Sequence, residues 1–422
     1  MANPELVAHN QQFEKKIFEH AEGLWTAVGY AASNVHMVEG KDTVTIIDTT
    51  ESTKAAENIS AEFRKLCDKP VGRIIYTHSH RDHISGATIF AKQAEGDLPI
   101  LASRNFQSDL VGLDENRIAP DKALGQRTMA QFGIGLNGEQ RINLGCGPGD
   151  RPMEGLGAGY LPPTELIEGD CDIDLDGVAA RLLMMPGETP DHMVVWLPQQ
   201  NVLFCGDNWY HSFPNLYAIR GTAYRDYEAW AQTLGRLAAL KPLVLAPGHT
   251  NPVYGADQVE DVLISTRDAI LHVMRFTADA MDQGMAVNDI AASIELPPEL
   301  ADRPWLKEFY GKLGWSARAY AAGTLGWYDG NATHLGTLST QARAAELAAL
   351  AGGADKLTIA AEQTRNLQWR LELCDHLTAL GRDVRSLKAG ALEKLAEDEI
   401  NATARNTYLW QAMKLRQAIA AG

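Results

Sequence analysis

Cysteine is scarce in this chain, and long apolar runs are missing from it. The 422 residues include five cysteines and no C-x-x-C pair, which argues against a disulfide framework or a zinc ribbon and suits a reducing compartment. No stretch reaches the roughly 18 apolar residues that span a bilayer. The first 16 residues are polar and charged, unlike a signal peptide. We therefore expect a cytoplasmic protein that does not enter a membrane; a secreted protein whose leader was trimmed is the alternative.

Positive charge is also in short supply. Lys and Arg number 38 against 54 Asp and Glu, a formal charge of −16. Nucleic acids and anionic membranes repel such a surface, so neither is an expected partner. A phosphate-binding G-x-x-x-x-G-K-[ST] loop is absent as well. A small anionic substrate would therefore need a local cationic site made by Arg, Lys or bound metal ions.

What the chain does contain is a regular alternation of strand-like and helix-like segments in its first part. Polar residues follow several of the strands, which is typical of a layered α/β domain. Residues 105–163 are rich in glycine and read as a long loop or cap. From about residue 257 onward the periodicity is helical. We thus expect a layered α/β domain over 1–257 and an all-helical domain over 258–422. The predicted strands cover 44–47, 73–76, 181–185, 193–197, 202–205 and 243–246, and the first predicted helices cover 55–66 and 87–95.

The strongest motif is T-H-S-H-R-D-H at residues 77–83, directly after a predicted strand. Three histidines and one aspartate lie within six residues. Neutral imidazoles and a carboxylate are the donors that hold divalent metal ions, and residues two apart in a tight loop can converge on one ion. The segment therefore predicts a metal centre at a strand end.

This H-x-H-x-D-H pattern resembles the signature of the metallo-β-lactamase superfamily. The resemblance implies an αββα sandwich with one or two metal ions, usually zinc, at the edge of its sheets. P-G-E-T-P-D-H at 186–192 is similar to the family's P-G-H-T-P-x-H turn, with Glu188 where most members have histidine. F-C-G-D at 204–207 and P-G-H at 247–249 are similar to the strands that end in the bridging carboxylate and the last histidine ligand.

Glutamate in the third ligand position resembles the alkylsulfatase branch. N-L-Y-A-I-R-G at 215–221, followed by R-D at 225–226, is similar to a stretch of that branch. L-P-P-E-L at 296–300 and G-W-Y-D-G-N at 326–331 resemble its helical dimerisation domain, which implies a homodimer. Full-length members continue into a lipid-carrier-like domain, and we expect this chain to lack it.

The resemblance also implies a ligand set for two divalent ions. His78, His80 and His249 are expected ligands, Asp82 and His83 are assigned to the second ion, and Asp207 is expected to bridge the two. Glu188 is the expected third-position ligand, with His192 as its rival. Asp82 is also expected to take part in catalysis. Zinc suits the histidines, although Glu188 is compatible with manganese or iron.

The substrate side of the site involves residues that follow Asp207. His211 is a candidate proton donor, or else a packing histidine. Arg220 is a candidate clamp for a sulfate ester, with Asn215 as an added donor; the alternative for Arg220 is an ion pair. Tyr217, together with Trp209 and Tyr210, lines the pocket or belongs to the core.

These residues predict a binuclear metal hydrolase of sulfate esters that uses a metal-activated water. We favour cleavage of the C–O bond, because a held sulfate is a good leaving group, although S–O cleavage is also known in the family. The alternative enzyme acts on a phosphoester, a lactone or a β-lactam with the same site. The non-enzymatic alternative is a metal-binding scaffold that assembles through its helices.

Overall fold

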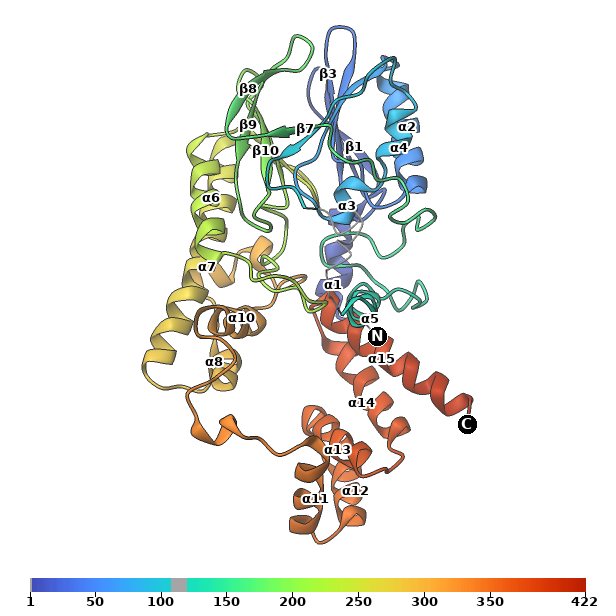
Figure 1. The fold of residues 1–422 in the computed structure, drawn as a ribbon, viewed down its shortest axis with the longest axis vertical. Coiled ribbons are helices and arrows are strands. Elements are labelled where there is room, and N and C mark those ends of the chain that lie inside the picture. The colour runs from blue at the N-terminus through green and yellow to red at the C-terminus, as the bar shows by residue number, and fades with distance from the viewer. Residues whose placement is uncertain (1, 108–119) are drawn as a thin grey trace.

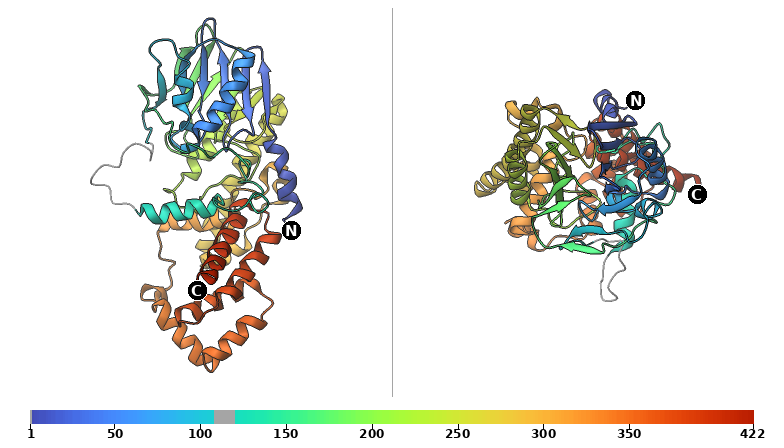
Figure 2. Two further views of the ribbon diagram at one scale, coloured as in Figure 1. Left: turned by 90° about the vertical axis from the view of Figure 1, so that its right-hand side faces the viewer. Right: turned by 90° about the horizontal axis from the view of Figure 1, so that it is seen from above.

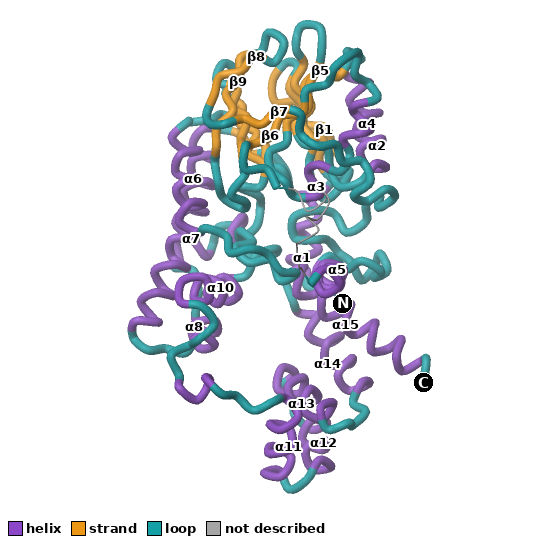
Figure 3. Tube along the Cα trace, viewed as in Figure 1, coloured by secondary structure: helices purple, strands orange, loops and turns teal. Residues whose placement is uncertain are grey.

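The computed structural model describes residues 2–107 and 120–422. Within them, two β-sheets form one end of the molecule and helices form the other (Figures 1 and 3). Four strands near the middle of the sheets, at 24–28, 44–47, 193–197 and 202–206, are buried along their whole length, so their side chains show no regular alternation of apolar and polar residues.

The first sheet carries its strands in chain order. It is antiparallel from β1 to β4 and parallel from β4 to β7. Parallel pairing places the carboxyl ends of β4, β5 and β6 at one edge. The strands are β1 (Lys16–Ala21), β2 (Leu24–Val28), β3 (Val35–Glu39), β4 (Val44–Ile47), β5 (Val71–Ile75), β6 (Ile100–Ser103) and β7 (Glu165–Ile167).

The second sheet has the order β13-β12-β11-β10-β9-β8. Its β11 and β12 are parallel, and the other pairs are antiparallel. The parallel pair again brings two carboxyl ends together. The strands are β8 (Cys171–Asp174), β9 (Ala179–Met184), β10 (Met193–Leu197), β11 (Val202–Gly206), β12 (Val244–Pro247) and β13 (Val253–Tyr254).

Helices cover the outer faces of both sheets, so the core has three apolar layers. α2 (Thr53–Leu66) and α4 (Ala87–Ala91) pack on the first sheet. α6 (Tyr227–Ala239) and α7 (Ala256–Asp282) pack on the second. The middle layer, which includes Ile47, Ile75, Leu182 and Phe204, fills the space between the sheets. This arrangement is the αββα sandwich that the sequence predicted.

The rest of the chain is helical, as predicted. α8 and α10 pack on each other, α11 to α13 lie farthest from the sheets, and α15 returns toward the sandwich beside α5 (Figures 1 and 2). There the Asn406 amide donates to the carbonyl oxygens of Gln131 (3.4 Å) and Asn143 (3.2 Å). The helices are α8 (Val287–Ser293), α9 (Pro298–Ala301), α10 (Leu313–Leu325), α11 (Thr340–Ala351), α12 (Ala354–Gln363), α13 (Leu367–Ala379), α14 (Arg385–Asp398) and α15 (Ala402–Ala420), with short 3-10 turns at His9–Phe13, Pro304–Leu306 and Ala332–Leu335.

Several local predictions differ from the structure. The predicted loop over 105–163 contains helix α5 (Asp121–Gln131), whose apolar spacing is weak, and its residues 108–119 lie outside the described part. The helix predicted over 87–95 ends at Ala91. Strands β1 to β3, β6 to β8 and β13 were not predicted. The N-terminal α1 (Pro4–Ala8) and the single turn α3 (Arg81–Ile84) complete the elements.

The predicted boundary at residue 257 falls at the start of α7. One apolar cluster joins Trp230 of α6, Ile270 of α7 and Leu313 of α10, so packing is continuous across this point. The boundary therefore stays a prediction. In the described part of the chain, no helix is both long enough and apolar enough to cross a membrane.

Candidate metal centre

The predicted ligands come from strand ends that meet at one edge of the sandwich. Thr77 to His83 follow β5, Asp207 follows β11 and His249 follows β12. Glycine allows the last two loops to approach closely, because a Cβ at Gly248 would lie 2.5 Å from Asp207 Oδ1. Residues from both sheets thus converge on one buried region.

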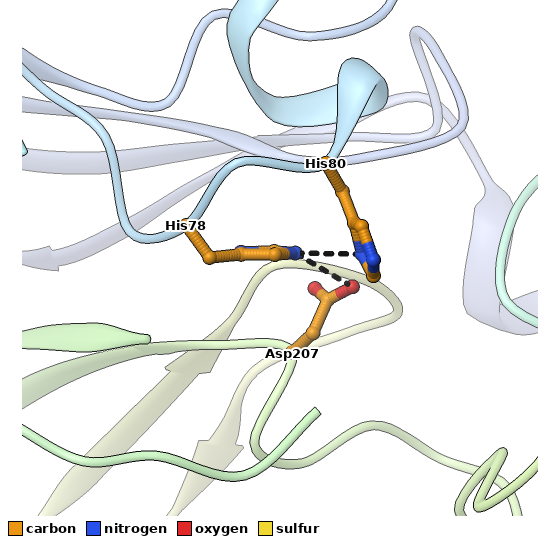
Figure 4. Close-up of side chains that lie close together, drawn as sticks. All are labelled: His78, His80 and Asp207. Carbon is orange, nitrogen blue, oxygen red and sulfur yellow. Dashed lines mark hydrogen bonds and ion pairs between the residues drawn. The ribbon is translucent and has the colours of Figure 1, made fainter. Parts of the chain in front are cut away.

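His78, His80 and Asp207 form the first group of donor atoms, all within 4.8 Å of one another (Figure 4). His78 Nε2 lies 3.0 Å from His80 Nδ1 and 3.7 Å from Asp207 Oδ2. His78 and Asp207 are buried, whereas His80 is half-buried.

Asp82, His83 and His249 form a second group of the same kind. His249 Nε2 lies 3.4 Å from Asp82 Oδ2, and His83 Nε2 lies 3.7 Å from the same oxygen. Asp207 also reaches this group, since its Oδ1 is 3.3 Å from His83 Nε2 and its Oδ2 is 3.1 Å from His249 Nε2. Asp207 therefore lies between the groups, where a bridging ligand would have to be.

The donor set fits divalent metal ions. His83 Nε2, Asp207 Oδ1 and Glu188 Oε2 are buried atoms without a hydrogen-bond partner in the described structure, and a bound cation would satisfy them. Burial opposes the charge of Asp207, yet His249 and His83 lower its pKa well below the ordinary value. Burial also opposes charge on the two rings, but Asp207 raises the pKa of His83 and of His249 well above the usual value. The negative charge of Asp207 and the positive charges of the two rings thus stabilise each other. A bound divalent cation would stabilise the carboxylate in the same way.

Glu188 lies beside the first group, with Oε1 3.8 Å from His80 Nδ1. Its partner is the buried Arg225, whose Nη2 is 2.7 Å from the same oxygen. Burial raises the pKa of Glu188 to about 7, although Arg225 opposes the shift. His192 is placed differently, since its Nε2 accepts the backbone N–H of Asp207 at 3.0 Å and its ring stacks on His78. The geometry favours Glu188 over His192 as a ligand, and the assignment itself stays a prediction.

Asp48 contacts the candidate site and was not singled out in the sequence analysis. It follows β4 and is fully buried. Its Oδ2 accepts hydrogen bonds from His83 Nδ1 and Thr77 Oγ1, and its Oδ1 accepts one from the Thr77 backbone N–H, each at 2.8 Å. A carboxylate on the far nitrogen fixes the orientation and tautomer of a ligand histidine. The sequence feature that could have identified Asp48 is its position directly after β4, a strand that is parallel to β5.

Arg220 and Asn215 lie on the segment that follows β11. Burial, and after it the positive charge of Arg220, lowers the pKa of His80 to about 3. The backbone N–H of Arg220 donates to Gln131 Oε1 at 2.8 Å, and its Nη1 donates to the Gly221 carbonyl. Asn215 is buried, and its Nδ2 has no partner among the described residues. A donor set suited to an anion therefore accompanies the metal ligands.

The positions of the aromatic residues and of His211 do not assign them to a substrate pocket. Trp209 and Tyr210 are buried in the core, where the Tyr210 hydroxyl accepts the Asn215 backbone N–H, and Tyr217 is half-buried. The His211 ring packs edge-on against Trp209. Burial lowers the pKa of His211 to about 4, so the ring is uncharged at neutral pH. This state does not favour its predicted role as a proton donor, which stays untested.

Two family models match the chain. One describes the metallo-β-lactamase superfamily and matches residues 28–249, and the other describes alkyl sulfatase dimerisation and matches residues 286–418. Helix α7 lies wholly between the two ranges. The matches agree with the sandwich and with the helical region that follows it.

Curated relatives cover nearly the whole chain. A linear primary-alkylsulfatase of Pseudomonas sp. (strain ATCC 19151) is 33% identical over 90% of this chain and 73% of its own length. An alkyl/aryl-sulfatase of Saccharomyces cerevisiae is 32% identical over 96% of this chain and 64% of its own length. The chain therefore spans about two thirds of these relatives.

The solved structures agree. The stereoselective inverting sec-alkylsulfatase Pisa1 from Pseudomonas sp. superposes with a TM-score of 0.87 at 28% identity, over 98% of this chain and 68% of that one. The similarity extends across the sandwich and the helical region alike. The chain thus belongs to the metallo-β-lactamase superfamily of hydrolases, in its alkylsulfatase family.

Proposed function

We propose that this protein hydrolyses sulfate esters to an alcohol and inorganic sulfate. The observation that carries the proposal is the pair of His/Asp groups sharing Asp207. Arg225 joins Glu188 to Asn215, and the charge of Arg220 acts on His80. Its relatives named as alkylsulfatases support the choice of ester. We also propose zinc as the metal, because nitrogen donors dominate both groups.

Two divalent ions held by these groups would supply Lewis acidity and lower the pKa of a bound water. The chain's own residues would do the rest. The planar guanidinium of Arg220 offers two parallel donors to sulfate oxygens, and the unpartnered Nδ2 of Asn215 offers a third. Arg225 holds Glu188 and donates through Nη1 to the Asn215 carbonyl, so it connects the metal side to the substrate side.

We further propose that water attacks carbon and that the C–O bond breaks. A sulfate that is held by cationic groups is a good leaving group, and its negative charge would be offset by Arg220. Hydrolysis in heavy-oxygen water should place the label in the alcohol. Label in the released sulfate would show S–O cleavage instead.

The first experiment is a substrate panel with the zinc-loaded protein. Release of sulfate from linear alkyl sulfates is expected, together with its loss in Arg220→Ala, by about 10²–10³-fold in kcat/KM for a removed anion donor. Arg236→Ala is the matched control, because Arg236 lies on α6 and makes an exposed ion pair with Asp170, the residue before β8. Turnover of lactones, β-lactams or phosphoesters without sulfate release would refute the proposed substrate. An equal loss of every activity in Arg220→Ala would refute the sulfate clamp.

We also propose a homodimer through the helical region. The segment between α10 and α11 exposes large apolar side chains, with Leu325 70% and Trp327 77% exposed, followed by Leu335 and Leu338. Apolar surface of this kind on a segment matched by the dimerisation model favours burial against a second copy.

A further inference from the structure

The glycine-rich segment Gly145–Gly159, part of the region predicted as a loop or cap, contacts the turn after β4 and the backbone of Ala32. It runs alongside residues 51–54 through backbone hydrogen bonds: Gly157 N–H donates to the Glu51 carbonyl at 3.0 Å, and Thr53 N–H donates to the Gly155 carbonyl at 3.3 Å. The Ser52 hydroxyl adds a hydrogen bond to the Pro152 carbonyl at 2.8 Å. The segment is thus fixed to the turn that follows β4.

A buried ion pair lies at the start of this contact. Arg151 Nε is 2.6 Å from Glu51 Oε1, and both side chains are at least 94% buried. The same Glu51 oxygen accepts the backbone N–H of Ala32 at 2.9 Å. Removing two charged side chains from water costs free energy unless their hydrogen-bond partners are well placed. The position of this ion pair therefore suggests that it has a role beyond stability.

Ala32 connects the pair to a predicted ligand. Its carbonyl oxygen accepts a hydrogen bond from His249 Nδ1 at 2.7 Å. Because a carbonyl can only accept, Nδ1 carries the proton, and in the neutral ring Nε2 keeps the lone pair for a metal ion. The two sides of one residue therefore contact Glu51 and His249.

The segment also contacts Ala32 directly. A Cβ on Gly147 would lie 2.6 Å from the Ala32 carbonyl oxygen and 2.9 Å from its Cα. Only glycine fits at such a distance without displacing that carbonyl. The next two residues are held equally well: Ser33 donates to the Asp82 carbonyl, and Asn34 Nδ2 donates to the carbonyls of Pro247 (2.9 Å) and Thr250 (2.8 Å).

We propose that the glycine-rich segment is a positioning element for His249, acting through the Glu51–Arg151 pair and through Gly147 on the carbonyl of Ala32. The inference rests on the proposed metal centre and assigns a role to residues that touch neither metal nor substrate. Groups that orient a ligand histidine typically contribute 10–100-fold to metal affinity. The expected effect is therefore on one metal ion, the one that His249 binds.

Zinc titration of the metal-free protein tests this, with a competing chromophoric chelator and with metal content measured per chain. In Glu51→Ala and in Gly147→Ala, one dissociation constant should rise about 10-fold or more while the other is unchanged. The weakened step should be the one that disappears in His249→Ala. Glu51→Gln keeps an acceptor for Ala32 and should have a smaller effect; it serves as the test if Glu51→Ala does not fold.

A matched control lies at the opposite end of β4. Asp176 accepts hydrogen bonds from Asp42 N–H, Thr43 N–H and Thr43 Oγ1, so Asp176→Ala removes a comparable tether far from the site. It should lower the melting temperature and leave both zinc affinities unchanged. If Glu51→Ala behaves in the same way, or weakens both zinc ions equally, the proposal is wrong.

The titration does not depend on which ester is hydrolysed. A wild-type protein that binds two zinc ions without releasing sulfate would refute the proposed substrate, and the role of Glu51 would still be decided by its own titration.

Discussion

Replacing Asp48 by asparagine should change the tautomer of His83 while the histidine itself stays in place. Asp48 has a φ of 58°, a left-handed conformation that asparagine tolerates, so Asp48→Asn keeps the backbone and the shape of the side chain. The amide can place its oxygen on the Thr77 N–H, as Oδ1 does now. Its NH2 then faces His83 Nδ1, where the carboxylate oxygen accepts a hydrogen bond in the wild-type protein.

The consequence for His83 follows from its tautomer. An amide donor facing Nδ1 favours the ring with its proton on Nε2, the atom 3.3 Å from Asp207 Oδ1 and 3.7 Å from Asp82 Oδ2. That nitrogen then has no lone pair for a metal. We expect affinity for one zinc ion to fall by 10–100-fold, or about 1.4–2.7 kcal/mol. Replacing a hydrogen bond to a charged carboxylate by a neutral one should also lower the free energy of unfolding by about 1 kcal/mol.

The assays are zinc titration and denaturant unfolding in excess chelator. Asp42→Asn is the control, because that carboxylate is exposed at the other end of β4 and should change neither quantity. Unchanged affinity for both ions in Asp48→Asn would refute the argument that Asp48 selects the tautomer of His83.

Three further predictions concern packing and assembly. Arg225→Met leaves the buried carboxylate of Glu188 unpaired and should lower the free energy of unfolding by about 3–5 kcal/mol, measured with denaturant in excess chelator. Burial lowers the pKa of His9 and of His20 to about 4, so below pH 6.5 the unfolded rings bind protons that the folded rings exclude. Stability is therefore complete above about pH 6.5 and falls toward pH 4, by about 2 kcal/mol per histidine at pH 5, which unfolding at several pH values measures. Trp327→Asp should reduce the molar mass of the particle in light scattering from a dimer toward a monomer, because the exposed indole is replaced by a charge.

Each of these has a control within the chain. Arg303→Met breaks an ion pair with Asp261 that is one third exposed, and its effect should be far smaller than that of Arg225→Met. His9→Phe should flatten the pH dependence, and an unchanged slope would contradict the assignment. Leu243→Asp changes an apolar residue of similar prominence on the sandwich, 48% exposed, and should leave the dimer intact.

The helical region and much of the sandwich could be predicted because their signals are local. The motif at residues 77–83 follows β5 as expected, and the helical period after residue 257 corresponds to α7 and its successors. Strands β2 and β3 are buried almost throughout, so they lack the alternation that identifies a half-buried strand. The buried polar residues Thr26 and His36 also interrupt the continuous apolar run that β10 and β11 show. Helix α5 was missed because its spacing marks no apolar face.

The sequence by itself determined the family, the αββα fold and the set of candidate donors. It could do so because the histidines and carboxylates lie in short motifs that directly follow predicted strands. Only the tertiary structure decided how those donors group. Asp207 lies between both groups. Glu188 lies beside His80 and has an unpartnered Oε2, whereas Nε2 of His192 accepts a backbone N–H. Asp48 contacts His83, and Arg225 pairs with Glu188. These relations join segments tens to hundreds of residues apart. They arise from the parallel pairing of β4 with β5 and of β11 with β12, which brings distant strand ends to one edge.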